Sequence, residues 1–255
     1  SMTAANLEWA LRWGFRQTNC MRAARWAWKS SLPTNILFQE TDKFESDPTT
    51  YLLRSEGSAA FGGKTGGGVM RIGIFGGSFN PVHQGHIRLA QEALSELNLD
   101  KIYFVPSCQN PLKEKEDLLP DAVRVRILKA ALRRHPDFLI SLCEIQRQGL
   151  SFTVDTLKFF KKKFGRNVVL YFLSGTDVLA GIERWKSVDE LFKLCHFVVM
   201  TRPGYEFKRS KRPFIHVPFS ALDVSSSEVR QRLKHGRSIR SLAPLGTETL
   251  LNNIY

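Results

Sequence analysis

The chain has 255 residues, 43% of them hydrophobic, which is enough to bury one sizeable core. No apolar run approaches the roughly 20 residues that cross a bilayer, so we expect a soluble protein without a membrane partner. The formal charge of +13 favours anionic partners such as nucleic acids or phosphorylated small molecules. The four cysteines are scattered and form no C-x-x-C pair, so we expect neither a disulfide framework nor a cysteine zinc site, and a cytoplasmic location.

The first 69 residues differ from the rest of the chain. They contain four tryptophans without a sustained period and end in a glycine-rich stretch typical of a linker. Three interpretations compete: a targeting segment, an additional domain, or an unstructured extension that arises from a misassigned upstream reading frame. We favour the last, because Gly-Gly-Gly-Val before Met70 is what a purine-rich ribosome-binding sequence would encode. The predicted folded domain is therefore 70–255, which carries +11 of the charge.

Strand and helix patterns alternate from Met70 onward. The predicted strands are 71–75, 101–105, 138–142, 168–173, 197–200 and 214–217. The predicted helices are 84–97, 120–134, 153–164, 187–194, 225–234 and 247–254. This alternation predicts an α/β fold with a doubly wound parallel sheet, in which ligands bind at the carboxyl ends of the strands.

The segment between the first strand and the first helix carries the strongest chemical signal. Gly76 and Gly77 allow a tight turn that can bring backbone N–H groups against a phosphate. His83 and His86 are three residues apart at the helix start, where imidazoles can donate hydrogen bonds to a phosphoryl group in transfer. Two such histidines could also bind a metal, but no third ligand stands at metal-site spacing, so we predict no metal ligands in the protein.

Residues 76–86, Gly-Gly-Ser-Phe-Asn-Pro-x-His-x-Gly-His, resemble the signature of the H-x-G-H nucleotidyltransferase superfamily. The resemblance implies a Rossmann-like fold that binds ATP or CTP beneath this helix. It implies catalytic roles for His83 and His86. It also implies nucleotide contacts from Gly76, Gly77, Ser78, Phe79, His83 and His86.

A second signal lies at the start of the predicted helix 225–234. Ser225, Ser226 and Ser227 begin this helix, and Arg230 follows one turn later. Hydroxyls and free N–H groups at a helix start can form an anion site. The alternative is an ordinary cap, in which Ser225 and Glu228 form a capping box. The segment is similar to the superfamily motif that grips the ATP phosphates, which implies ATP contacts from Ser225, Ser226 and Arg230.

Three further segments resemble the nicotinate mononucleotide adenylyltransferase family: 106–113, 151–157 and 174–186. The family implies that Lys113 reaches the ATP phosphates and that Trp185 stacks on the pyridine ring. The implied contacts to nicotinate mononucleotide are Asn80, Phe152, Thr153, Gly175, Asp177, Trp185 and Lys186. Each has an ordinary alternative: a solvated charged loop for Lys113, a helix cap for Thr153 or Asp177, and packing for Trp185.

The resemblance implies transfer of AMP from ATP to nicotinate mononucleotide, a step of NAD biosynthesis, with Mg²⁺ carried by ATP rather than by a protein cage. Oligomeric state stays open, and a homo-oligomer is compatible with the sequence. Two alternatives are kept. One is a superfamily member that transfers an adenylyl or cytidylyl group to another phosphorylated acceptor. The other is a basic nucleic-acid-binding module, for which Phe159-Phe160 and the three following lysines are the best candidate.

Overall fold

The computed structural model describes residues 50–51, 69–109, 111, 118–201, 212–219 and 222–255. Most of the predicted extension 1–69 and the predicted ATP contact Lys113 lie outside these residues. The predicted boundary at residue 70 stays a prediction.

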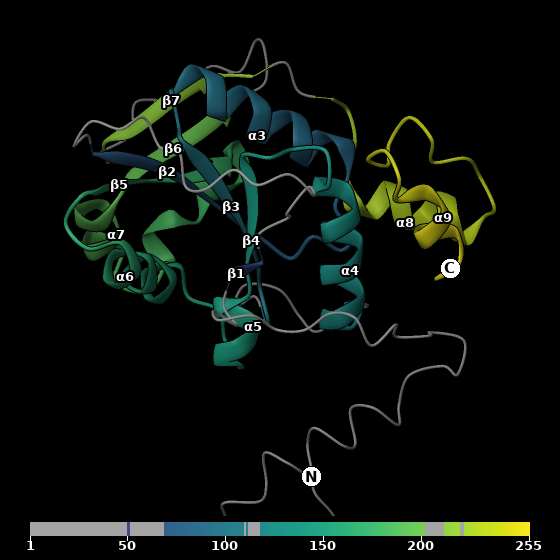
Figure 1. Cartoon of the computed structure of the whole chain (residues 1–255), viewed down its shortest axis with the longest axis horizontal. Coiled ribbons are helices and arrows are strands. Elements are labelled where there is room, and N and C mark those ends of the chain that lie inside the picture. Colours follow the sequence, from purple (N-terminus) through teal and green to yellow (C-terminus); the bar gives the residue numbers. More distant parts are fainter. Residues whose placement is uncertain (1–49, 52–68, 110, 112–117, 202–211, 220–221) are drawn as a thin grey trace, which may run out of the picture. The chain divides into compact units, whose positions relative to one another are not determined.

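A seven-stranded sheet forms the centre of the fold (Figure 1). Its order is β1-β4-β3-β2-β5-β6-β7. The strands are β1 (Thr50–Tyr51), β2 (Met70–Gly77), β3 (Lys101–Pro106), β4 (Phe138–Ser141), β5 (Val168–Gly175), β6 (His196–Thr201) and β7 (Phe214–Pro218). The six strands β2 to β7 are parallel, and β1 pairs antiparallel with β4 at the edge. In chain order these six follow the 3-2-1-4-5-6 arrangement of the Rossmann fold, so the predicted fold class is confirmed.

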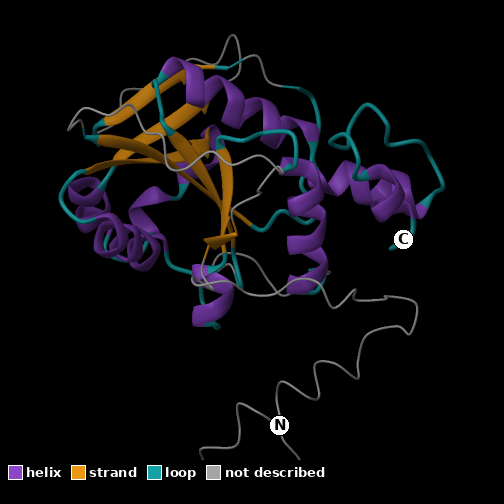
Figure 2. Ribbon diagram, viewed as in Figure 1, coloured by secondary structure: helices purple, strands orange, loops and turns teal. Residues whose placement is uncertain are grey.

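Helices cover both faces of the sheet (Figure 2). They are α3 (Gln84–Glu96), α4 (Asp121–Leu132), α5 (Cys143–Arg147), α6 (Thr153–Phe164), α7 (Val188–Leu194), α8 (Ser226–Lys234) and α9 (Glu248–Asn252), with 3₁₀ turns η2 (Thr176–Ala180) and η3 (Ile182–Arg184). The predicted helices all form, whereas α5, η2, η3 and β1 were not predicted. No helix in the described part of the chain is long and apolar enough to cross a membrane.

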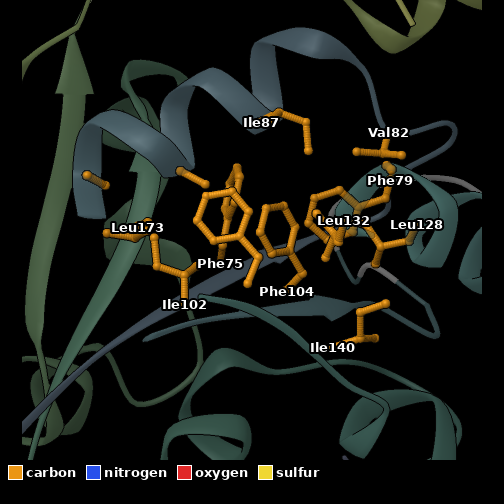
Figure 3. Packing of buried hydrophobic residues seen from close by; sticks show 14 of the residues in the cluster. Phe75, Phe79, Val82, Ile87, Ile102, Phe104, Leu128, Leu132, Ile140 and Leu173 are labelled. Carbon is orange, nitrogen blue, oxygen red and sulfur yellow. The ribbon is translucent and has the colours of Figure 1, made fainter. Parts of the chain in front are cut away.

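The central strands are buried on both faces because successive side chains enter different cores. In β3, Ile102 and Phe104 belong to the cluster under α3 and α4, whereas Tyr103 and Val105 belong to the cluster under α6 and α7. Figure 3 shows the first cluster, where Phe75 and Phe104 lie between the sheet and the helices. This two-sided burial explains why the strands appear in the sequence as continuous apolar runs rather than as alternating patterns.

The predicted signature lies at the point where the direction of winding reverses. β2 pairs with β3 on one side and with β5 on the other, and its carboxyl end at Gly77 runs into the loop that starts α3. In open α/β sheets, the crevice at such a switch point is the place where ligands bind. The fold therefore places residues 76–86 where the sequence predicts the nucleotide.

Candidate active site at the carboxyl ends of β2, β3 and β5

Phe79 anchors the signature loop to the core. Its side chain is only 2% exposed, and its ring centroid lies 5.6 Å from that of Phe75 and 5.5 Å from that of Phe104. The backbone at Phe79 has a positive φ of 44°, an uncommon conformation for a residue with a bulky side chain. The buried ring holds the loop in place, so a nucleotide contact at this position would come from the backbone rather than from the ring.

The rings of His83 and His86 pack against each other at the start of α3, with their planes tilted by 36°. Their ring centroids are 3.7 Å apart, and the His83 backbone N–H donates to Nδ1 of His86 over 3.1 Å. Because Nδ1 of His86 accepts this bond, Nε2 carries the proton of the neutral ring and can act as a donor. His83 is 9% exposed, and its Nδ1 is buried without a hydrogen-bond partner.

Burial lowers the pKa of His83 to about 4, so the ring is neutral in the folded protein at physiological pH. The unfolded chain takes up this proton near pH 6.5, whereas the folded protein resists it until about pH 4. Stability therefore falls as the pH drops from 6.5 towards 4. Between pH 7 and pH 5, we expect His83 to account for a loss of about 2 kcal/mol in the free energy of unfolding.

Urea unfolding of the wild type and of His83→Gln at pH 7 and pH 5 measures this contribution. The variant should lose about 2 kcal/mol less than the wild type over the same interval. Equal losses in the two proteins would show that His83 titrates as an exposed histidine does.

The start of α8 packs on the signature loop. The Ser225 hydroxyl accepts a hydrogen bond from the Glu228 N–H over 3.1 Å, which is the capping bond considered as the alternative for this residue. The Ser226 hydroxyl donates to the Pro81 carbonyl over 2.9 Å, and Arg230 Nη1 donates to the Asn80 carbonyl over 2.7 Å. Both side chains thus hold the signature loop by hydrogen bonds to its backbone. Their predicted contacts with ATP phosphates stay predictions.

A pocket of about 180 Å³ opens beside the signature loop. Gly76 and Gly77 of β2 and Ser107 after β3 form one side, and the segment that starts α6 forms another. For comparison, a protein cavity of about 150 Å³ binds benzene. The pocket has the size of a single aromatic ring.

Four of the predicted acceptor contacts line this pocket: Phe152, Thr153, Trp185 and Lys186. The Trp185 ring packs edge-on against Phe172, at 6.0 Å and 83°, and is half-buried. The Lys186 ammonium lies 4.5 Å from the Phe152 ring centroid and 3.1 Å from the Asp155 carboxylate. Residues 152–153 and 185–186, far apart in sequence, therefore meet at one site.

The other three predicted acceptor contacts are not among the residues that line the pocket. Gly175 ends β5 and the exposed Asp177 lies in η2, where a Cβ on Gly175 would be 2.9 Å from Asp177 Oδ1. The Asn80 side chain is buried, and its Oδ1 accepts a hydrogen bond from the Leu119 N–H over 3.0 Å. In this structure Asn80 connects the signature loop to the segment before α4.

A buried carboxyl group in the pocket lining was missed by the sequence analysis. Glu144 of α5 is 6% exposed, and the Thr156 hydroxyl donates to its Oε1 over 2.5 Å. Burial raises the pKa of Glu144, although hydrogen bonds from Thr156 and Ser151 oppose this effect. The available signal was one acidic residue within the apolar run 142–145, but its burial depends on α5, which the sequence did not predict.

The described residues contain no group of three or more His, Cys, Asp or Glu side chains that could hold a metal ion. Besides the Glu144 carboxyl group, the polar groups at this site are imidazoles, hydroxyls, backbone amides and cations. This set of groups suits a phosphate ligand rather than a bare divalent cation.

A family model described as cytidylyltransferase-like matches residues 74–232. A probable nicotinate-nucleotide adenylyltransferase of Thermoanaerobacter sp. is 38% identical over 190 residues, which cover 70% of this chain and 90% of that protein. A probable enzyme of the same name from Clostridium tetani is 36% identical over 189 residues, 70% of this chain and 94% of the relative.

Solved structures share the fold. The nicotinic acid mononucleotide adenylyltransferase of Plasmodium falciparum complexed with NaAD gives a TM-score of 0.60 at 20% identity, covering 72% of this chain and 96% of that one. The same enzyme complexed with APC gives 0.59. The family model and the curated relatives together show that the chain belongs to the cytidylyltransferase-like family, in its nicotinate-nucleotide adenylyltransferase branch.

Proposed function

We infer that the chain transfers the adenylyl group of ATP to nicotinate mononucleotide, giving nicotinate adenine dinucleotide and pyrophosphate. The observation that carries this proposal is the ring-sized pocket, which shares Gly76 and Gly77 with the signature loop. A pyridine ring in the pocket would place its attached ribose phosphate beside the loop that receives ATP. The curated relatives carry the name of this activity.

In the proposed reaction, an oxygen of the acceptor phosphate attacks the α-phosphorus of ATP in line, and the bond to pyrophosphate breaks. No protein nucleophile is needed, so catalysis consists of positioning and charge stabilisation. Nε2 of His86 would donate to the α-phosphate, and the neutral His83 would stay beside it without adding charge. Arg230 and Lys113 would steady the β- and γ-phosphates.

Two cations among the residues that line the pocket favour an anionic ring. Arg184 and Lys186 both line the pocket and are exposed at its mouth, where either cation can attract the carboxylate of nicotinate. Trp185 and Phe152 add aromatic side chains to the pocket lining. The uncharged amide of nicotinamide mononucleotide would gain less from these cations, so we expect the nicotinate form to be the preferred acceptor.

Mg²⁺ would reach the site on the triphosphate and neutralise part of its charge when bound. We expect EDTA in excess of the metal to abolish turnover and Mg²⁺ to restore it. Turnover unaffected by the chelator would remove Mg²⁺ from the proposal. A cytoplasmic location is proposed on the cysteine pattern alone.

Pyrophosphate release with ATP and Mg²⁺ tests the substrate assignment. The acceptors are nicotinate mononucleotide, nicotinamide mononucleotide, pantetheine phosphate and none. We expect the highest kcat/KM with nicotinate mononucleotide. A preference for another acceptor would keep the superfamily chemistry but discard the assigned substrate, and no release with any acceptor would discard the activity.

A further inference from the structure

Arg124 of α4 is a fully buried arginine beside the active site, and the proposed mechanism does not use it. Its guanidinium donates to the carbonyl of Ser78 over 2.6 Å, that of Ser107 over 2.7 Å and that of Leu119 over 3.1 Å. Asp121, one turn earlier, is its carboxylate partner. Taking an arginine out of water costs several kcal/mol unless its donors are satisfied, and here three backbone carbonyls and a carboxylate engage four of its five N–H groups.

Two of these carbonyls belong to the loops that form the active site. Ser78 follows β2 in the signature loop, and Ser107 follows β3 and lines the acceptor pocket. One planar guanidinium therefore holds the start of the signature loop and the start of the loop after β3, residues 107–109, called the acceptor loop here, at a fixed separation.

The two bonds also fix the orientation of two peptide planes. In a trans peptide the N–H points opposite to the C=O. Arg124 donates to the Ser78 carbonyl, so the N–H of Phe79 in the same peptide plane points away from the guanidinium. A loop that binds phosphate needs its N–H groups, and not its carbonyls, directed at the anion.

The second plane extends the connection from the acceptor loop to the segment before α6. The Ser107 carbonyl accepts from Arg124, and the N–H of Cys108 in the same plane donates to the Ser151 hydroxyl over 3.0 Å. The Ser151 N–H in turn donates to the Gln109 carbonyl over 2.8 Å. Ser151 directly precedes Phe152 and Thr153, which line the pocket.

We propose that Arg124 is a positioning residue. It fixes the position of the signature loop relative to the acceptor loop, through the peptide planes after Ser78 and Ser107. The inference rests on the proposed adenylyl transfer and concerns how its two substrates are aligned. When Arg124 is replaced, each loop is still held by the strand that it follows, so each substrate can still bind. What is lost is the alignment of the acceptor phosphate with the α-phosphorus of ATP.

This role predicts a separation of kcat from KM. We expect Arg124→Met to lower kcat by about 100-fold, because a misplacement of about 1 Å can cost this much, while both KM values change by less than about 3-fold. The kcat of Arg124→Lys should lie between those of the wild type and Arg124→Met, since an ammonium cannot reach all the carbonyls in the geometry of a guanidinium. Arg126→Met, an exposed position on the same helix, is the matched control and should keep the wild-type kcat.

A purely structural role would give a different pattern. It would lower the melting temperature and the folded fraction, but kcat per folded molecule would stay at the wild-type value. The assay is therefore run well below the melting temperature of each variant and normalised to its folded fraction. If Arg124→Met does not fold, Arg124→Lys decides: a normal kcat per folded molecule overturns the proposal.

A double-mutant cycle with Ser151→Ala tests the connection itself. If Arg124 and Ser151 act through the same peptide plane, Arg124→Lys combined with Ser151→Ala loses less kcat than the product of the two single losses. A loss equal to that product would show that the two residues act independently and would overturn the proposed link. The wild type is the reference for the function: an inactive wild type refutes the proposed activity, whereas an active wild type with a normal Arg124→Lys refutes only the role of Arg124.

Discussion

Replacing His86 by alanine should lower kcat for adenylyl transfer by about 10²–10³, the usual cost of removing one donor to a transition state. The physical reason is the orientation of the ring. The His83 N–H occupies Nδ1 of His86 over 3.1 Å, which leaves the Nε2 proton for the ligand. KM for either substrate should change little, because this bond strengthens only as charge develops on the α-phosphate.

His196→Ala is the matched control for this variant. His196 is exposed at the start of β6, at the end of the sheet opposite to the site, and its loss should leave kcat unchanged. Steady-state kinetics of both variants give the comparison. A kcat for His86→Ala within about 3-fold of the wild type would remove His86 from the catalytic role.

Replacing Trp185 by alanine should raise KM for nicotinate mononucleotide by about 10- to 100-fold and leave KM for ATP nearly unchanged. Stacking of a ring on an aromatic side chain contributes about 1–3 kcal/mol per base in nucleic-acid complexes, and the pyridine ring is of similar kind. The pocket is small enough for one ring, so loss of one wall removes a large share of its contact area.

Trp185→Phe separates ring contact from packing damage. Trp185 also contacts Phe172 and Phe197, so alanine will lower stability as well as affinity. Phenylalanine keeps an aromatic face and should recover most of the affinity. An alanine variant with an unchanged KM for the acceptor would mean that Trp185 only packs.

Most of the regular elements could be predicted because their buried residues recur with a clear period or form continuous apolar runs. Strand β5 is an apolar run covered on both faces, and its predicted range 168–173 lies within the observed Val168–Gly175. Helix α5, with five residues, and the 3₁₀ turns after β5 are too short to show a period. Their formation depends on tertiary contacts that a sequence pattern does not contain.

The candidate site was predictable where residue type and chain position together limit the chemistry. The histidines follow a strand and a glycine turn, and the parallel sheet brings that junction to its carboxyl edge. Arg124 and Glu144 were not predictable, because Arg124 appears in the sequence as an ordinary charge on a helix and Glu144 lies in α5, which the sequence did not predict. Only the fold buries them and supplies their partners, the carbonyl of Ser107 and the hydroxyl of Thr156.

The transfer of label from ATP tests the central claim most directly. The protein is incubated with Mg²⁺, nicotinate mononucleotide and ATP labelled on either the α- or the γ-phosphate, and the products are separated. The proposed reaction puts the α-label into the dinucleotide and the γ-label into pyrophosphate. An α-label that stays with free nucleotide, or a γ-label that moves to the acceptor, would contradict adenylyl transfer.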